Sequence, residues 1–230
     1  KNQNTVLLAP TGSGKTIAFL LPILKMMDAN KDQIQALVLA PSRELSIQIE
    51  HVFKSMKTGF RSLCCYGGHA VSVEKKSLQA RPALLIGTPG RIADHLRREH
   101  IDTSGMQILV LDEFDKSLEF GFENEMSFII GRLKQLKKRV LTSATQSLII
   151  PDFTGINDPA MLNFLADGPA EGLALKMVMS DTIEKTETLF RLLCHLGKHS
   201  TLVFCNHREA VERISRFLSE RQLENDIFHG

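Results

Sequence analysis

The stretch from Ala9 to Thr16, Ala-Pro-Thr-Gly-Ser-Gly-Lys-Thr, has the residue types and spacing of a phosphate-binding loop. An apolar run, Thr5–Leu8, precedes it, and a second apolar run, Ile17–Leu21, follows it. We expect the first run to form a buried strand and the second to begin a helix, which is the context that such a loop requires. The alternative is a glycine-rich turn in an unrelated sheet, which the position of Gly-Lys-Thr between strand and helix disfavours.

The residues of this loop suit the phosphates of a nucleotide. Gly12 and Gly14 allow backbone conformations that direct successive amides at one anion, and the following helix adds its own unpaired N–H groups. Lys15 can reach the terminal phosphates, and the Thr16 hydroxyl can bind Mg²⁺. Ala9 replaces the usual first glycine, so the loop matches a relaxed form of the motif. The predicted nucleotide-binding residues are Ala9, Thr11, Gly12, Ser13, Gly14, Lys15 and Thr16.

An acidic group, Asp112-Glu113-Phe114-Asp115, follows the apolar run Ile108–Leu111, so its carboxylates project from the end of a predicted strand. Asp112 is a candidate ligand for Mg²⁺, and Glu113 is a candidate for orienting and activating an attacking water. Acidic residues at strand ends are also common in turns and helix caps. The phosphate-binding loop earlier in the chain favours the catalytic interpretation.

A third group, Ser143-Ala144-Thr145, also follows a predicted strand. A turn or a helix cap is the default interpretation of such a tripeptide. The hydroxyls of Ser143 and Thr145 can also hydrogen-bond Asp115, which would couple the state of the nucleotide to a neighbouring surface.

Apolar runs bounded by turn residues are typical of strands that are buried on both faces of a parallel sheet. We predict such strands at Thr5–Leu8, Ala36–Ala40, Ser62–Tyr66, Ala83–Gly87, Ile108–Leu111 and Val140–Ser143. Helical patterns lie between them, as in Arg43–Lys57. This alternation predicts a doubly wound α/β fold, in which ligands gather at the carboxyl ends of the strands.

The last third of the chain predicts the beginning of a second, similar domain. The segment 158–180 contains prolines and glycines that suit a domain end and a linker. Beyond it we predict a helix at Thr182–Leu196, a strand at Thr201–Cys205, a helix with a capping box of Asn206 and Glu209, and a strand at Asp226–His229. The expected division is a first domain at 1–166, a linker at 167–181 and an incomplete second domain at 182–230.

The composition excludes few classes of function. The 230 residues are 43% hydrophobic with a formal net charge of +2, which permits a nucleic-acid partner without requiring one. No apolar run approaches the roughly 20 residues needed to cross a membrane, so we expect no membrane association. The four cysteines lack metal-ligand or redox-pair spacing, and reduced thiols in a cytoplasmic protein are the preferred interpretation.

The phosphate loop, the acidic group and the Ser-Ala-Thr group, in this order and spacing, resemble the ATPase motifs of the DEAD-box RNA helicases. Further stretches resemble that family: Pro41-Ser42-Arg43-Glu44-Leu45, Gly67-Gly68, Thr88-Pro89-Gly90-Arg91, Gly121-Phe122 and Leu202-Val203-Phe204-Cys205-Asn206. The resemblance runs from residue 1 to residue 230. It implies ATP and Mg²⁺ as cofactors, recombinase-like domains, and RNA-stimulated ATP hydrolysis coupled to local unwinding of RNA.

The resemblance also implies RNA contacts at Pro41, Ser42, Arg43, Gly67, Gly68, Thr88, Pro89, Gly90 and Arg91. Small residues expose backbone amides and the arginines offer cationic forks, which suits a sugar–phosphate backbone and recognition that is independent of base sequence. Each stretch has an alternative. Ser42 can cap a helix, Thr88-Pro89-Gly90 can be a turn before a helix, and the two arginines can pair with neighbouring carboxylates.

Three features depart from the family pattern. Phe114 replaces the alanine of the acidic motif, and we expect its bulk to pack near the nucleotide. The glutamine segment that reads adenine and the arginine-rich motif of the second domain are absent from these 230 residues, and Gln3 is too close to the loop to replace the former. We therefore expect weak ATP binding and little or no unwinding by this chain alone.

The prediction is an ATP-dependent RNA helicase, with two other classes open. One is an ATP-gated RNA clamp or scaffold without unwinding, which a comparison of strand displacement with ATP hydrolysis would separate. The other is a DNA translocase of the same superfamily, which competition between RNA and DNA would separate, because 2′-hydroxyl contacts distinguish them.

Overall fold

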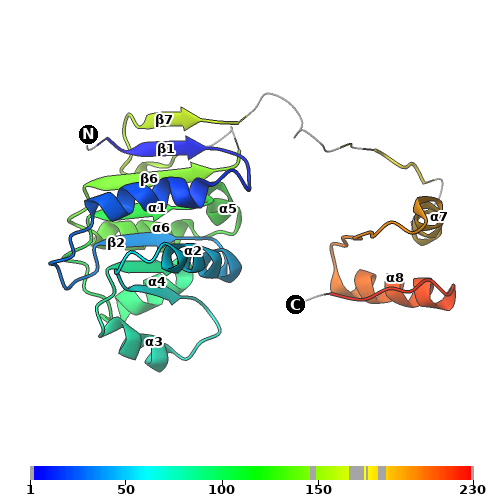
Figure 1. The fold of residues 1–230 in the computed structure, drawn as a ribbon, viewed down its shortest axis with the longest axis horizontal. Coiled ribbons are helices and arrows are strands. Elements are labelled where there is room, and N and C mark those ends of the chain that lie inside the picture. The colour runs from blue at the N-terminus through cyan, green and yellow to red at the C-terminus, as the bar shows by residue number, and fades with distance from the viewer. Residues whose placement is uncertain (1–2, 146–148, 166–173, 175, 181–184, 229–230) are drawn as a thin grey trace. The chain divides into compact units, whose positions relative to one another are not determined.

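The computed structural model (Figure 1) describes residues 3–145, 149–165, 174, 176–180 and 185–228. The chain divides into two compact units, residues 1–169 and 170–230, which are considered separately below. The predicted linker, 167–181, lies largely outside the described residues. The division into a first domain at 1–166, a linker at 167–181 and an incomplete second domain at 182–230 therefore stays a prediction.

The first unit is built on a seven-stranded parallel sheet with the order β3-β4-β2-β5-β6-β1-β7. Its strands are β1 (Thr5–Leu8), β2 (Ala36–Leu39), β3 (Ser62–Cys65), β4 (Leu84–Gly87), β5 (Ile108–Leu111), β6 (Lys138–Ser143) and β7 (Ala160–Asn163). All six predicted strands are confirmed, with ends that agree to within two residues. The predicted α/β class is confirmed as well. The edge strand β7 was not predicted, because it lies in the segment whose proline and glycine content indicated a linker.

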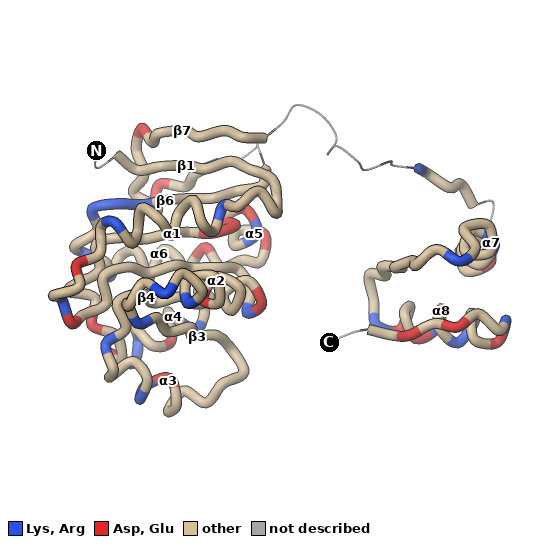
Figure 2. The backbone as a smooth tube through the Cα atoms, viewed as in Figure 1, with Lys and Arg blue, Asp and Glu red and all other residues tan. Residues whose placement is uncertain are grey.

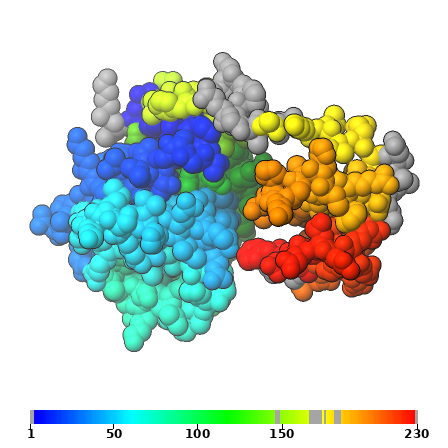
Figure 3. Space-filling model, turned by 45° about the vertical axis from the view of Figure 1, so that its right-hand side comes forward, coloured from blue at the N-terminus to red at the C-terminus, as the bar shows by residue number. Residues whose placement is uncertain are grey.

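Helices cover both faces of this sheet, as a doubly wound fold requires. The helices of the first unit are α1 (Lys15–Met26), α2 (Arg43–Ser55), α3 (Val71–Leu78), α4 (Pro89–Arg97), α5 (Phe114–Glu119) and α6 (Glu123–Arg132). Apolar residues of α1 and α2 form one hydrophobic cluster with the sheet, and those of α3 to α6 form another. The outer surfaces of α1 and α2 form part of the face seen in Figure 3, in blue and light blue.

Successive residues of the central strands alternate between the two clusters. In β2, Ala36 and Val38 face the cluster of Phe19 on α1, whereas Leu37 and Leu39 face the cluster of Ile92 on α4. This alternation is the period of two that strand geometry imposes. Because both faces are buried, the strands read as continuous apolar runs.

Strand order divides the carboxyl edge of the sheet into two halves. The loops that follow β1, β6 and β5 are neighbours on one half, and the loops that follow β2, β4 and β3 are neighbours on the other. The last residues of adjacent strands are in register, as for Leu39 with Leu111 and with Gly87. The two halves meet between β2 and β5.

The second unit contains α7 (Thr186–Leu196) and α8 (Arg208–Glu220), which confirms helices in both predicted places. The start of the first predicted helix, at 182–184, lies outside the described residues. The Phe190 and Phe217 rings of these helices meet edge to face, with centroids 6.4 Å apart. No helix in the described parts of either unit has the length and apolar character needed to span a bilayer.

Three predictions for the second unit were wrong. Residues 201–205 and 226–228 do not form strands, whereas residue 229 lies outside the described residues. A strand needs a neighbouring strand for its backbone hydrogen bonds, and none of the described residues of this unit forms a strand. The side chains of Leu202 and Phe204 are also 85% and 92% exposed. The capping box of Asn206 and Glu209 is also not formed, because α8 begins one residue later, after His207.

Candidate active site

The phosphate loop connects β1 to α1, as predicted. The Ala9 N–H donates to the carbonyl of Ser143 at 3.1 Å, so the loop starts against the end of β6. Gly12 and Gly14 have φ values of +80° and +87°, in the region that side chains rarely adopt. Gly14 is the residue before the first turn of α1, and residues 10–14 are exposed. The loop therefore presents backbone amides and a helix N-terminus at the surface.

Lys15 lies inside the curve of this loop. Its side chain is mostly buried, and its Nζ donates to the carbonyls of Ala9 at 2.6 Å and Pro10 at 3.3 Å. These two hydrogen bonds hold the ammonium group beside the phosphate loop, where a bound phosphate would lie. Contact with a phosphate would exchange weak carbonyl acceptors for charged oxygens, which form stronger hydrogen bonds.

Asp112 and Glu113 follow β5, and the hydroxyl of Thr142 on β6 joins them. This hydroxyl donates to Asp112 Oδ1 and accepts from the Glu113 backbone N–H at 3.1 Å. Thr142 is fully buried and was not predicted; its position one residue before the Ser-Ala-Thr group was the only sequence signal. Burial raises the pKa of the Asp112 carboxyl above its ordinary range, and the Thr142 hydrogen bond partly opposes that shift. A nearby cation would favour the ionised form of Asp112.

Glu113 has an unusual backbone conformation for a side chain of its size. Its φ and ψ values are +45° and +53°, and it precedes the first turn of α5. Non-glycine residues in this left-handed region carry strain that the surrounding structure must offset. The hydrogen bond from its amide to Thr142 contributes to holding this conformation. Its side chain is partly exposed at the carboxyl end of the sheet.

The predicted contact of the Ser-Ala-Thr group with Asp115 is half right. Thr145 Oγ1 donates to Asp115 Oδ2 at 3.1 Å, which confirms that contact. Ser143 Oγ instead accepts from the Thr145 N–H at 3.0 Å and lies 3.1 Å from the Thr145 carbonyl, so it shapes the turn. Within the described residues, the hydrogen bonds of the Ser143 hydroxyl go to Thr145 and not to Asp115. The coupling role of these residues stays a prediction.

Phe114 is directed into the hydrophobic core. It is fully buried in the cluster formed with α3 to α6, and its ring centroid lies 6.4 Å from that of Phe153. The bulk that replaces the family's alanine is therefore accommodated by core packing. The acids on either side of it, Glu113 and Asp115, keep their hydrogen bonds to β6 and the turn after it.

Helices begin in the stretches Pro41–Arg43 and Thr88–Arg91. This confirms the local roles that were predicted as alternatives to RNA contact. Ser42 is the N-cap of α2, and its Oγ accepts from the Leu45 N–H at 3.2 Å. Thr88 precedes α4, and Pro89 is the first helical residue, where its missing N–H costs nothing. A helix N-terminus also offers free backbone amides to phosphate, so these local roles do not compete with RNA contact.

The two arginines differ in their partners. Arg91 Nε lies 2.7 Å from Glu74 Oε2, so the predicted alternative of a carboxylate partner is present. The exposed Arg43 guanidinium stacks on the Tyr66 ring at 4.9 Å from its centroid. Gly68, two residues after that tyrosine, has a φ of +98°, which explains a glycine at this position.

These residues form two groups along the edge of one sheet. The phosphate loop, Asp112, Glu113 and Thr145 follow β1, β5 and β6, whereas the arginine- and glycine-containing stretches follow β2, β3 and β4. A phosphate loop after the first strand of a parallel sheet, with acids at the same edge two strands away, defines a recombinase-like nucleotide-binding α/β protein.

Comparison with known proteins gives the family. The sequence model described as DEAD/DEAH box helicase matches residues 1–151, about two thirds of the chain. This chain belongs to the DEAD/DEAH box helicase family.

Individual relatives agree with this assignment. "ATP-dependent RNA helicase eIF4A" of Pyricularia oryzae is 33% identical over all of this chain and 60% of its own length. "ATP-dependent RNA helicase CshA" of Listeria monocytogenes is 34% identical over 96% of this chain and 44% of its own length. The crystal structure of a DEAD box protein from Methanococcus jannaschii superposes with a TM-score of 0.64 at 26% identity, covering 99% of this chain and 62% of that one. This chain thus spans about 60% or less of the relatives' length.

Proposed function

We propose that this chain is the nucleotide-binding part of an ATP-dependent RNA helicase, in which ATP hydrolysis separates or remodels short RNA duplexes. The observation that carries the proposal is the placement of the phosphate loop, after β1, at the same sheet edge as the buried Asp112 and the strained Glu113, after β5. Only β6 lies between these two strands. The names of the relatives support ATP as the nucleotide and RNA as the substrate.

The oxygen donors at this edge fit Mg²⁺. The Thr16 hydroxyl and the Asp112 carboxylate are hard ligands of the kind that Mg²⁺ prefers. Asp112 is 3% exposed, and its side-chain partner among the described residues is the neutral Thr142 hydroxyl. A buried carboxylate without an ion-pair partner is costly, and a bound cation would offset that cost. When bound, Mg²⁺ would neutralise charge on the phosphate oxygens.

The side chains of the site divide the work of hydrolysis. The loop amides and Lys15 would bind the phosphates, with Lys15 Nζ moving from the Ala9 carbonyl to a phosphate oxygen. Glu113 would orient the attacking water and accept its proton. Thr142 would hold Glu113 and Asp112 in fixed positions. The hydrogen bond between Thr145 and Asp115 would couple the state of the nucleotide to a neighbouring surface.

The second half of the sheet edge would bind the RNA backbone. Helix N-termini after Ser42 and Thr88, the Gly67-Gly68 turn and the exposed Arg43 are suited to phosphate rather than to bases. Figure 2 shows Lys and Arg interspersed with Asp and Glu along the first unit. RNA binding would therefore depend on a few local contacts instead of a large basic surface.

A cytoplasmic location is part of the proposal. All four cysteines are unpaired, and Cys64 and Cys65 remain thiols although they are adjacent. Free thiols are typical of a reducing compartment. Cell fractionation with an antibody against this chain would test the location directly.

The experiment that tests the proposed function measures ATP hydrolysis by the full-length protein with single-stranded RNA or with DNA of the same sequence. Displacement of a short RNA duplex is measured alongside. We expect RNA to stimulate hydrolysis at least about tenfold, DNA to stimulate it much less, and displacement to require ATP. Stimulation without displacement would instead favour an RNA clamp, and equal stimulation by DNA would favour a DNA translocase.

A further inference from the structure

A buried carboxylate lies between two of the predicted RNA-contact stretches. Glu74, on α3, is 3% exposed. Removing a carboxylate from water is costly unless cations and hydrogen-bond donors replace its hydration. The identity of those partners shows what the carboxylate connects.

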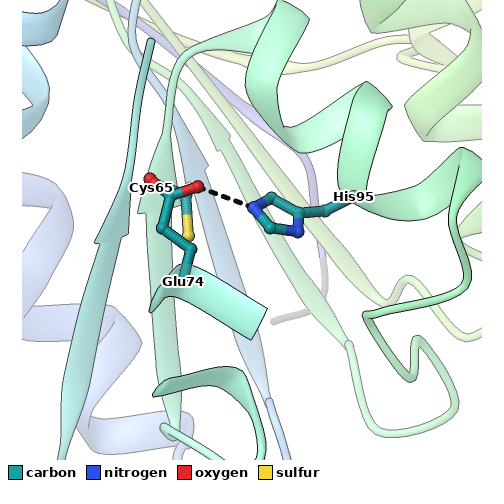
Figure 4. A group of neighbouring side chains, drawn as sticks. All are labelled: Cys65, Glu74 and His95. Carbon is teal, nitrogen blue, oxygen red and sulfur yellow. Dashed lines mark hydrogen bonds and ion pairs between the residues drawn. The ribbon is translucent and has the colours of Figure 1, made fainter. Parts of the chain in front are cut away.

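Three groups contact the two oxygens of Glu74. Arg91 Nε and His95 Nε2 each lie 2.7 Å from Oε2, and the Tyr66 backbone N–H donates to Oε1 at 3.2 Å. Figure 4 shows the Glu74 carboxylate directed toward the His95 ring, with Cys65 on β3 beside it. One side chain of α3 thus connects the loop after β3 with Arg91 near the start of α4 and His95 in its last turn.

Two of these three partners belong to the predicted RNA contacts or adjoin them. Tyr66 immediately precedes Gly67-Gly68, and Arg91 is itself a predicted contact. Arg91 Nη2 also donates to the backbone carbonyl of His69, on the other side of the glycine pair. Glu74 therefore fixes the beginning of this glycine loop directly and its end through Arg91.

The third predicted contact rests on the same loop. Arg43 stacks on the ring of Tyr66, which in turn lies 4.6 Å from the His69 ring, centroid to centroid. A Cβ added to Gly68 would lie 3.7 Å from Arg43 Nη1. All three stretches are thus joined through one loop that Glu74 holds.

We propose that Glu74 is a positioning residue for RNA binding, which holds Arg91 and the Gly67-Gly68 loop in the arrangement that receives the sugar–phosphate backbone. The inference rests on the proposed RNA-binding function. Groups that are already ordered lose less conformational freedom on binding. Loss of the Glu74 charge would free Arg91 and the loop, and would weaken RNA affinity without altering the chemistry at the phosphate loop.

Zinc binding is the competing interpretation of this cluster. Cys65, Glu74 and His95 are donors that zinc accepts, and their ligand atoms lie within 4.8 Å of one another. Two features favour an ion pair between Glu74 and Arg91 over a zinc site. The guanidinium already supplies positive charge to the carboxylate. Burial raises the pKa of the Cys65 thiol, which disfavours the thiolate that zinc requires.

The test compares Glu74→Gln with the wild type in the full-length protein, using RNA-stimulated ATP hydrolysis and thermal unfolding. Glutamine keeps an acceptor for the Tyr66 amide but removes the charge that faces Arg91. We expect the apparent KM for RNA to rise about tenfold, while kcat at saturating RNA and the KM for ATP stay within about twofold. Glu50→Gln is the matched control: Glu50 forms an ion pair with Lys54 at 2.9 Å, and its loss should leave the KM for RNA unchanged.

Arg91→Lys approaches the same contact from the other side and serves if Glu74→Gln does not fold. Lysine keeps the positive charge but not the fork that reaches both Glu74 and the His69 carbonyl. We expect a similar rise in the KM for RNA. The double variant should show little further rise, because both substitutions act through one contact.

The possible failures are distinguishable. An unchanged KM for RNA in folded Glu74→Gln, with or without a lower Tm, would overturn the positioning role. Stoichiometric zinc in the purified wild type that Glu74→Gln removes would overturn it as well. A wild-type protein whose ATP hydrolysis does not respond to RNA would refute the proposed function itself, and the inference with it.

Discussion

Thr142 connects Asp112, the candidate Mg²⁺ ligand, with Glu113, the candidate general base. Its hydroxyl donates to Asp112 and accepts from the Glu113 amide. In Thr142→Val the shape is nearly preserved, but both hydrogen bonds are lost. We predict that ATP turnover of the full-length protein falls about tenfold, equivalent to about 1.4 kcal/mol, in steady-state assays.

Thr154→Val controls for the loss of a buried hydroxyl. Thr154 is 1% exposed, donates to the Pro151 carbonyl at 2.9 Å and accepts from the Ile156 amide at 3.3 Å. It resembles Thr142 in burial and in the number of hydrogen bonds, but it contacts neither acid. Similar destabilisation with unchanged turnover is expected for Thr154→Val. Wild-type turnover in Thr142→Val would show that Thr142 does not position the acids.

The cysteines give a pH-dependent prediction. Burial, with a contribution from Glu50, raises the pKa of the Cys64 thiol to about 12, and burial raises the pKa of Cys65 as well. Since the thiolate is the reactive form, iodoacetamide at about pH 8 should modify the exposed Cys194 long before either. Peptide mass spectrometry measures the rates, and unfolded protein, in which all cysteines should react alike, is the control. Equal rates at Cys65 and Cys194 in the folded protein would contradict the burial of Cys65.

The same shifts predict the sign of a stability change. The folded state holds the Cys64 and Cys65 protons more tightly than the unfolded state, because their folded-state pKa values are raised. Their contribution to stability is therefore complete below 9.0, the ordinary thiol pKa, and is lost as the pH rises above it. The free energy of unfolding in urea should accordingly decrease above that pH.

Among the elements, β3 and β4 approach each other so closely that Gly87 has no room for a side chain. A Cβ there would collide with the Cys65 carbonyl and would lie 2.8 Å from Ile92 Cδ1. We predict that Gly87→Ala lowers the free energy of unfolding by about 1–3 kcal/mol, measured by urea denaturation.

Gly131→Ala is the control for this substitution. Gly131 lies within α6, and a Cβ there would meet nothing within 4 Å. Alanine favours the helix by up to about 1 kcal/mol, so this variant should be slightly more stable than the wild type. If Gly87→Ala were as stable as Gly131→Ala, the close approach of β3 and β4 would be wrong.

Elements were predictable where local pattern and burial agree. The strands of the central sheet are buried on both faces, so their apolar runs identified them, and the phosphate loop was recognisable because its glycines serve a local conformation. The strand predicted at residues 201–205 has an equally apolar sequence but no pairing partner in the described part of its unit. Apolar character alone does not supply the backbone partner that a strand requires.

The connections within the site were harder to predict. Glu74 and His95 lie on short helices where glutamate and histidine usually face water, and nothing in their spacing indicates burial. They meet only because α3 and α4 pack on the same face of the sheet. Thr142 was missed for the same reason, since its partners lie 29 and 30 residues away, just after β5.

At the scale of the whole first unit, one edge of the sheet is shared between two tasks. The loops after β1, β6 and β5 carry the candidate ATP site, and those after β2, β4 and β3 carry the predicted RNA contacts. The halves adjoin where β2 pairs with β5. This division predicts that RNA affinity and ATP affinity respond to different substitutions.

Arg43→Ala tests this division. Arg43 is exposed, and its loss removes one cation from the RNA half. We predict that the slope of log K for single-stranded RNA against log salt becomes shallower by about 0.7, with ATP affinity in the absence of RNA unchanged. Lys54→Ala is the control, because Lys54 is on the same helix but pairs with Glu50. An equal change of slope in both variants would assign Arg43 to general surface charge.

The most direct measurement is ATP binding and single-turnover hydrolysis by Lys15→Ala and Glu113→Gln in the full-length protein at saturating RNA. We predict that Glu113→Gln binds ATP within about threefold of the wild type but hydrolyses it at least about 100-fold more slowly. Lys15→Ala should weaken ATP binding at least about tenfold. Wild-type binding and turnover in both variants would show that ATP is neither bound at this loop nor hydrolysed beside it.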